Sequence, residues 1–236
     1  MPKIKICGLF REEDIAFVNE ARPDYIGFVF AKSRRQVTPS QAARLRSKLG
    51  AGIVPVGVFV NAPVKDIAAL CRAGTIAVVQ LHGGEDEGYI RCLREACDAQ
   101  VIKAAPVKTR DDLLPRAAGG GADFLLLDHG AGGTGERFNW QLVVREGEAA
   151  GMSRTSGPSF RPSGFPYFLA GGVDVHTLSE ALAVNAGGIP SLGLAFYGID
   201  VSSGAETGGV KDRDKILRLV ELVRKHEFVN LNGGTE

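Results

Sequence analysis

The sequence predicts a single-domain α/β fold, a (β/α)8 barrel of the TIM type, from three observations. Eight short apolar runs alternate with eight helical patterns along 236 residues, the number and order of elements in such a barrel. The runs are almost continuously hydrophobic, which is typical of parallel strands buried on both faces. An open doubly wound sheet is disfavoured because the early GxGxxG motif of its nucleotide-binding members is missing.

The predicted elements follow one another in strict alternation. Strands are expected at 3–6, 25–30, 54–60, 76–81, 101–104, 124–127, 167–170 and 197–201. Helices are expected at 12–20, 39–49, 64–72, 87–96, 110–117, 140–149, 175–184 and 212–225. Pro39, Pro63 and Asp212 stand where helices should start, and Gly50 and Gly74 stand where helices should stop.

Two stretches interrupt this alternation. Residues 151–166 are rich in Ser, Gly and Pro without periodicity, which predicts an extended loop before the seventh strand. Residues 185–196 lengthen the connection before the eighth strand. Neither has the character of a second domain, so we expect the barrel to occupy residues 1–228 and residues 229–236 to form a frayed tail.

The composition disfavours several classes of protein. A formal net charge of +1 argues against a broad nucleic-acid-binding surface. No apolar run approaches the roughly 18 residues of a membrane span, and the start of the chain does not resemble a signal peptide, so we expect a cytoplasmic protein. The 4 cysteines and 4 histidines form neither a CxxC pair nor a zinc pattern, so no metal is predicted. The 31 glycines are expected mainly in turns at the strand ends.

Polar residues at the C-terminal ends of the strands are the candidates for function, because chemistry gathers there in this architecture. Gly171 and Gly172 follow the seventh strand, and Asp200 precedes the run Ser202, Ser203 and Gly204 at the end of the eighth. Backbone N–H groups beside glycines approach an anion closely, and barrels often bind phosphate in these two loops. The competing interpretation is two tight turns without a ligand.

Cys7 and Asp128 are the candidates for acid–base chemistry. A thiol at a strand end becomes a base when its pKa is lowered, and a carboxyl group in a partly desolvated pocket can keep its proton and act as an acid. Their structural alternatives are a core cysteine and a turn-capping aspartate. Arg35, or its neighbours Lys32 and Arg34, is the candidate for holding a carboxylate, with an exposed basic loop as the ordinary alternative.

Together these motifs resemble the phosphoribosylanthranilate isomerase family of tryptophan biosynthesis. The matching segments, spread from Lys3 to Asp212, are KICG, GFVF…KSRRQV, GVFVN, QLHG, IKA, LLLD…GGTGERFNW, LAGG and GIDVSSGAE…GVKD. Other phosphate-binding barrels share the late glycine turns but not the opening cysteine. Asn139 and Ala205 stand where the family commonly has Asp and Val. The longer loops resemble fungal versions, where this domain often ends a multifunctional polypeptide, so association with other tryptophan-pathway enzymes is also expected.

The resemblance implies an Amadori rearrangement of N-(5-phosphoribosyl)anthranilate to 1-(2-carboxyphenylamino)-1-deoxyribulose 5-phosphate. Asp128 matches the general acid that protonates the furanose ring oxygen, Cys7 the base that removes the C2 proton, and Arg35 the contact to the anthranilate carboxylate. Phosphate and sugar are expected on Gly171, Gly172, Asp200, Ser202, Ser203 and Gly204. No metal or organic cofactor is implied, because the reaction only moves protons.

Two alternatives stay open. One is another phosphosugar isomerase of the same barrel type, such as the histidine-pathway isomerase, which uses two aspartates; Cys7 argues against it. The other is a non-catalytic phosphate-binding barrel, which predicts no loss of function when Cys7 or Asp128 is changed.

Overall fold

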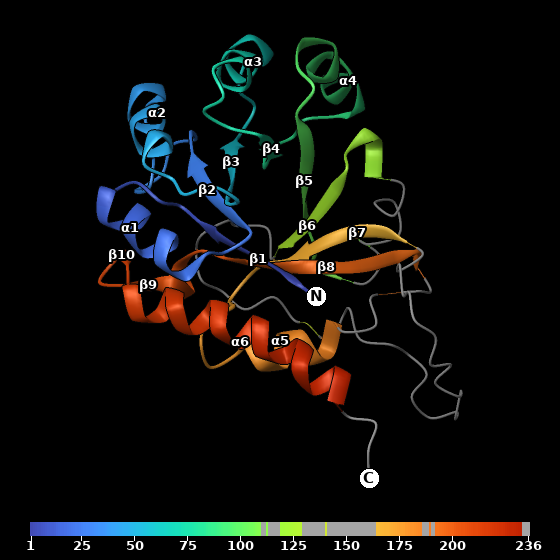
Figure 1. Ribbon diagram of the computed structural model, residues 1–236. Helices are drawn as coiled ribbons and strands as arrows, with labels where there is room; N and C mark the ends of the chain where they lie inside the picture. Colours follow the sequence, from blue (N-terminus) through green and yellow to red (C-terminus); the bar gives the residue numbers. More distant parts are fainter. Residues whose placement is uncertain are drawn as a thin grey trace.

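The predicted barrel is present. The computed structural model describes residues 1–109, 112, 119–128, 140, 164–185, 189 and 192–232. Eight parallel strands, each paired with the next in chain order, close on themselves when β8 pairs with β1 (Figure 1). The strands are β1 Lys3–Cys7, β2 Tyr25–Val29, β3 Val54–Phe59, β4 Val78–Leu81, β5 Gln100–Pro106, β6 Phe124–Asp128, β7 Phe165–Leu169 and β8 Leu194–Val201.

Helices surround this barrel. They are α1 Glu12–Ala21, α2 Pro39–Ser47, α3 Val64–Arg72, α4 Glu87–Ala96, α5 Leu178–Asn185 and α6 Arg213–Asn232. The expected helices at 110–117 and 140–149 lie outside the described residues, apart from Asp112 and Trp140, as does most of the expected loop at 151–166. Two 3-10 turns, η2 Gly119–Gly121 and η5 Ser203–Ala205, and a small antiparallel hairpin of β9 Glu206–Thr207 and β10 Val210–Lys211 complete the described elements.

Local sequence explains where several helices start. Thr38 accepts a hydrogen bond from the Gln41 N–H with Pro39 in the first helical position, and Asp86 caps α4 through the Tyr89 N–H. Asp212 accepts a hydrogen bond from the Lys215 N–H at the start of α6, as predicted. Among the described residues, no helix is both long and apolar enough to cross a membrane.

Three predicted boundaries were wrong by three residues or more. β8 begins at Leu194 rather than at 197, because Phe165 pairs with Leu194 and extends the ladder into the expected loop, with an irregularity beside Tyr167. α5 begins at Leu178 rather than at 175, because Asp174 first closes a turn by accepting the His176 and Thr177 N–H groups.

The third wrong boundary is the end of α6, which continues to Asn232 instead of stopping at 225. The chain has no Gly or Pro between residues 213 and 232, so nothing local ends the helix earlier. Residues 229–232 therefore belong to this helix, and residues 233–236 of the expected tail lie outside the described part of the chain.

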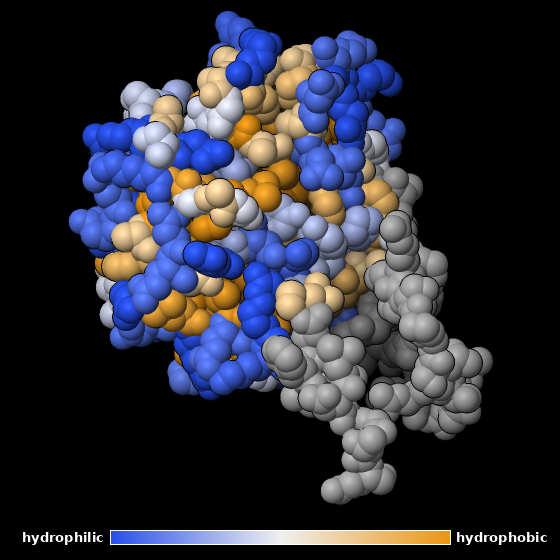
Figure 2. Space-filling view, viewed as in Figure 1, coloured by the Kyte–Doolittle hydropathy of each residue, from blue (hydrophilic) through white to orange (hydrophobic). Residues whose placement is uncertain are grey.

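Aromatic and aliphatic side chains fill the interior of the barrel. Tyr25, Phe124, Phe168 and Tyr197 pack ring against ring, and the Tyr25 and Tyr197 hydroxyl groups are 2.7 Å apart. A separate apolar layer lies between the strands and the outer helices. On the face seen in Figure 2, hydrophilic residues dominate the periphery and apolar residues show between them. The polar candidates therefore project from the ends of a rigid, packed barrel.

Candidate active site

Cys7 is the last residue of β1, and its side chain is buried. It pairs in register with Gly27 of β2, and a Cβ atom at Gly27 would lie only 2.7 Å from the Cys7 sulfur. The glycine of the GFVF motif therefore leaves room for the thiol. Burial raises the pKa of the Cys7 thiol above its ordinary value, although the charge of Lys5 opposes this shift.

A buried ion pair lies beside this thiol. Lys5 lies two residues before Cys7, so both side chains leave the same face of β1. The Lys5 Nζ is 2.8 Å from Oδ1 of Asp200, its register partner on β8. Asp200 was predicted among the substrate contacts, whereas no sequence motif pointed to a role for Lys5. The structure instead makes Asp200 the counterion of a lysine that solvent does not reach.

Asp128 ends β6 and is buried, with 9% of its surface exposed. Its Oδ2 lies 3.6 Å from Nε2 of His82, which follows β4. The side-chain amide of Gln80 lies 3.0 Å from His82 Nδ1, so this ring nitrogen is engaged by β4 while Nε2 faces Asp128. The QLHG motif alone pointed to no role for its histidine, because the proximity of His82 to Asp128 arises only in the folded barrel.

Arg35 is buried against a carboxylate of the β9–β10 hairpin. Its Nε and Nη2 donate to Glu206 at 2.6 and 3.0 Å, and Lys211 and Arg34 contact the same carboxylate at 2.7 and 2.5 Å. Burial alone would raise the pKa of Glu206, but the hydrogen bonds from Arg35 and Lys211 hold it below its ordinary value. Glu206 is therefore the shared carboxylate partner of three cationic side chains, a role that the sequence motif SSGAE did not reveal.

This pairing limits how Arg35 can meet a ligand. Its Cδ atom lies directly over Gly8, where a Cβ atom would overlap it, so the guanidinium is held next to the turn that follows Cys7. Nε and Nη2 both donate to Glu206, so among the described residues only the Nη1 group of this guanidinium has no hydrogen-bond partner. Of its neighbours, Arg34 shares Glu206 and Lys32 is exposed.

The two loops predicted to bind phosphate, after β7 and after β8, lie in contact with each other. Gly171 and Gly172 have left-handed φ values of 81° and 72°, and among the described residues no hydrogen bond engages their N–H groups. A Cβ atom at Gly204 would overlap the carbonyl oxygen of Val173, so only glycine lets the loop after β8 approach the loop after β7 this closely.

The loop after β8 also joins β1. Ser202 Oγ donates to the Cys7 carbonyl oxygen at 3.3 Å, and Lys211 Nζ donates to the Ser202 carbonyl oxygen at 2.9 Å. Ser203 begins the η5 turn that leads to Glu206. The predicted phosphate loops, the thiol and the arginine are thus parts of one connected region at the barrel rim.

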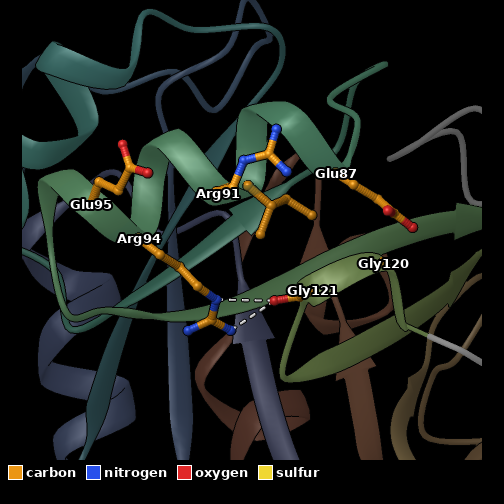
Figure 3. Close-up of a pocket in the computed structure, with 7 residues that line it drawn as sticks. Glu87, Arg91, Arg94, Glu95, Gly120 and Gly121 are labelled. Carbon is orange, nitrogen blue, oxygen red and sulfur yellow. Dashed lines mark hydrogen bonds between the residues drawn. The ribbon is translucent and has the colours of Figure 1, made fainter.

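A surface hollow of about 420 Å³ between α4 and η2 lies outside this region (Figure 3). Arg94 lines it and donates to the Gly121 carbonyl oxygen and to the Asp123 carboxylate. These contacts tie α4 to the start of β6 and make the hollow a structural junction. Within the described residues, no cluster of three or more His, Cys, Asp or Glu side chains could hold a metal ion. The GGTG segment lies outside the described residues.

Comparison with solved structures finds the same barrel. A structure of phosphoribosyl anthranilate isomerase from Thermotoga maritima matches with a TM-score of 0.75 at 29% identity, over 95% of this chain and 100% of that one. A phosphoribosyl anthranilate isomerase in complex with reduced 1-(o-carboxyphenylamino)-1-deoxyribulose 5-phosphate matches with a TM-score of 0.71 at 27% identity, over 95% of this chain and 100% of that one.

Sequence comparison agrees. A protein of Endomicrobium trichonymphae named N-(5'-phosphoribosyl)anthranilate isomerase is 43% identical over 228 residues, or 95% of this chain and 99% of that one. This relative is bacterial, so it lends no support to the expected likeness to fungal versions. The family model described as N-(5'phosphoribosyl)anthranilate (PRA) isomerase matches residues 4–222. The chain therefore belongs to the N-(5'-phosphoribosyl)anthranilate isomerase family.

Proposed function

We propose that this chain catalyses the Amadori rearrangement of N-(5'-phosphoribosyl)anthranilate to 1-(2-carboxyphenylamino)-1-deoxyribulose 5-phosphate in tryptophan biosynthesis. The observation that carries the proposal is that Cys7 and Asp128 end two strands of one closed barrel, on the rim that also carries the paired glycine loops. In this architecture, that rim is where substrates bind and react.

Asp128 is proposed as the general acid. It gives a proton to the furanose ring oxygen, the C1–O bond breaks, and the sugar opens to a Schiff base with the anthranilate nitrogen. His82, whose Nε2 lies 3.6 Å from Oδ2 of Asp128, is proposed to stabilise the carboxylate that remains. Burial of Asp128 at the barrel rim keeps this proton transfer away from bulk water.

Cys7 is proposed as the general base. Its thiolate removes the proton from C2 of the Schiff base, and the electron pair forms the enolamine. The enolamine then gains a proton at C1 and loses the one on the C2 hydroxyl group, which yields the ketone. The overall change is an isomerisation in which no electron leaves the substrate, so these two residues and their protons suffice for the chemistry.

The ends of the substrate are proposed to be held by the remaining residues. The Arg35 Nη1 group is assigned to the anthranilate carboxylate. The phosphate is assigned to the unengaged N–H groups of Gly171 and Gly172 together with Ser203 and Gly204. Ser202 and Asp200 are engaged by Cys7 and Lys5, so we assign them to shaping the site rather than to holding phosphate.

Replacing Arg35 by Ala is expected to raise KM for the ribotide about 10- to 100-fold, because it removes one hydrogen bond to a charged group of the substrate. The effect on kcat should be smaller. Glu206 keeps Lys211 and Arg34 as partners, so the fold should survive. Steady-state kinetics measure both constants. The matched control is Arg34→Ala, which removes a neighbouring guanidinium that is half exposed. An unchanged KM in Arg35→Ala, with a raised KM in Arg34→Ala, would move the carboxylate contact to Arg34.

The activity itself is tested by following the loss of anthranilate ribotide fluorescence with the purified chain. The labile ribotide is generated in situ from anthranilate and phosphoribosyl pyrophosphate. Turnover well above the buffer rate is the expected result, and decay at the buffer rate would refute the proposed function. Turnover of the histidine-pathway aminoaldose instead would favour the alternative phosphosugar isomerase.

We also propose a cytoplasmic setting for this activity. The described residues include 4 free cysteines, which suits a reducing compartment. Association with other tryptophan-pathway enzymes stays a prediction. Co-purification of the chain from its own cells, with those enzymes as the readout, would test it.

A further inference from the structure

We propose that Lys5, held in place by Asp200, is a positioning residue that stabilises the thiolate form of Cys7. This inference rests on the proposed function, in which Cys7 is the base. Lys5 has no exposed surface, so the role that we assign to it is exerted on its neighbour Cys7 and not on the substrate.

The strand register and the ion pair fix the position of the Lys5 ammonium group. Lys5 and Cys7 leave the same face of β1, and the parallel register of β1 with β8 sets Asp200 beside Lys5. The 2.8 Å ion pair joins residues that are 195 positions apart in the chain. From there, the positive charge of the ammonium favours the thiolate form of Cys7.

The charges around the sulfur identify Lys5 as the main support for a thiolate. Burial raises the pKa of the Cys7 thiol most strongly, and the charge of Lys5 is the strongest influence that lowers it. The charge of Asp200 raises this pKa, and that of Lys211 of β10 lowers it. Burial would lower the pKa of Lys5, but Asp200 and Cys7 outweigh burial and raise it, so the lysine stays charged. The Nζ of Lys211 lies 2.7 Å from the Glu206 carboxylate, and this negative charge weakens the effect of Lys211 on the Cys7 sulfur.

Stability alone does not account for this pair. Replacing a buried ion pair by well-packed neutral residues is often neutral or stabilising, because desolvation of two charges offsets their attraction. A lysine and an aspartate in the barrel interior, where apolar side chains otherwise pack, therefore point to a role in the chemistry of the adjacent thiol.

The test titrates Cys7 directly. In a background where Cys71, Cys92 and Cys97 are replaced by Ser, the ultraviolet absorbance of the thiolate is followed against pH, with the matching Cys7→Ser protein as the blank. Lys5→Met is expected to move the midpoint upward by about 1–3 pH units, the usual effect of one charge at close range. The control is Lys3→Met, which removes a Lys–Asp pair from the other end of β1 and should leave the midpoint unchanged.

A second readout separates this role from a structural one. The alkaline shift should reappear in the pH profile of kcat, with kcat at neutral pH falling by about 10-fold or more and KM unchanged. If Lys5→Met does not fold, the pair Lys5→Met and Asp200→Asn removes both charges at once. The midpoint should still rise, because Lys5 acts on the sulfur more strongly than Asp200 does.

A folded Lys5 variant whose thiol midpoint is unchanged would overturn the inference, whatever its activity. The proposed function fails separately, if the unmodified chain shows no turnover of the ribotide. A raised midpoint in a protein without isomerase activity would thus support the lysine's effect on the thiol and refute only the reaction.

Discussion

Replacing Asp128 by Asn is expected to lower kcat by about 10²–10⁴-fold, the usual contribution of a general acid. The amide has nearly the same shape as the carboxyl group but cannot deliver a proton to the ring oxygen. KM should change little, because the anthranilate and phosphate ends of the substrate keep their contacts. Fluorescence turnover measures the loss, and circular dichroism confirms the fold.

The matched control for this variant lies at the opposite end of the same strand. Asp123 directly precedes β6, pairs with Arg94 and accepts the Val101 N–H, so Asp123→Asn removes a carboxylate without touching the rim. Its turnover should stay near that of the unmodified chain. A folded Asp128→Asn protein with near-normal kcat would remove Asp128 from the mechanism.

Replacing Cys7 by Ala is expected to reduce kcat by about 10²–10⁴-fold as well, because no base then remains at the end of β1 to take the C2 proton. The vacated space is small and lies against Gly27, so the barrel should stay folded. Single-turnover kinetics would show the loss at the proton-abstraction step. Deuterium at C2 of the substrate should slow the unmodified enzyme if this step limits turnover.

The control for this variant is Cys71→Ala on α3, a half-buried cysteine outside the rim, which should leave kcat unchanged. The result also decides between an enzyme and a non-catalytic phosphate-binding barrel. That alternative predicts that neither Cys7→Ala nor Asp128→Asn has any functional consequence. If both variants still bind the phosphorylated product but no longer turn over the substrate, the non-catalytic barrel is excluded.

Most of the barrel was predictable because its signals are local. Each strand is a short apolar run, and helices such as α2 and α4 carry start signals, Thr38 and Asp86, directly before their first residue. The end of β8 was predicted, but its start at Leu194 was not, because that start depends on a ladder with Phe165 that no local pattern encodes. The end of α6 was missed for a different reason: no stop signal precedes residue 233.

For the site, local sequence patterns were enough to predict which groups stand at the strand ends: Cys7, Asp128 and the glycine loops. Their positions follow from the alternation of strands and loops, which is encoded locally in the chain. What surrounds them became visible only in the folded barrel, namely Lys5 on Asp200, His82 near Asp128 and Arg35 on Glu206. These partners come from strands and loops far apart in the chain, and the burial that strengthens their electrostatic interactions exists only once the barrel has closed.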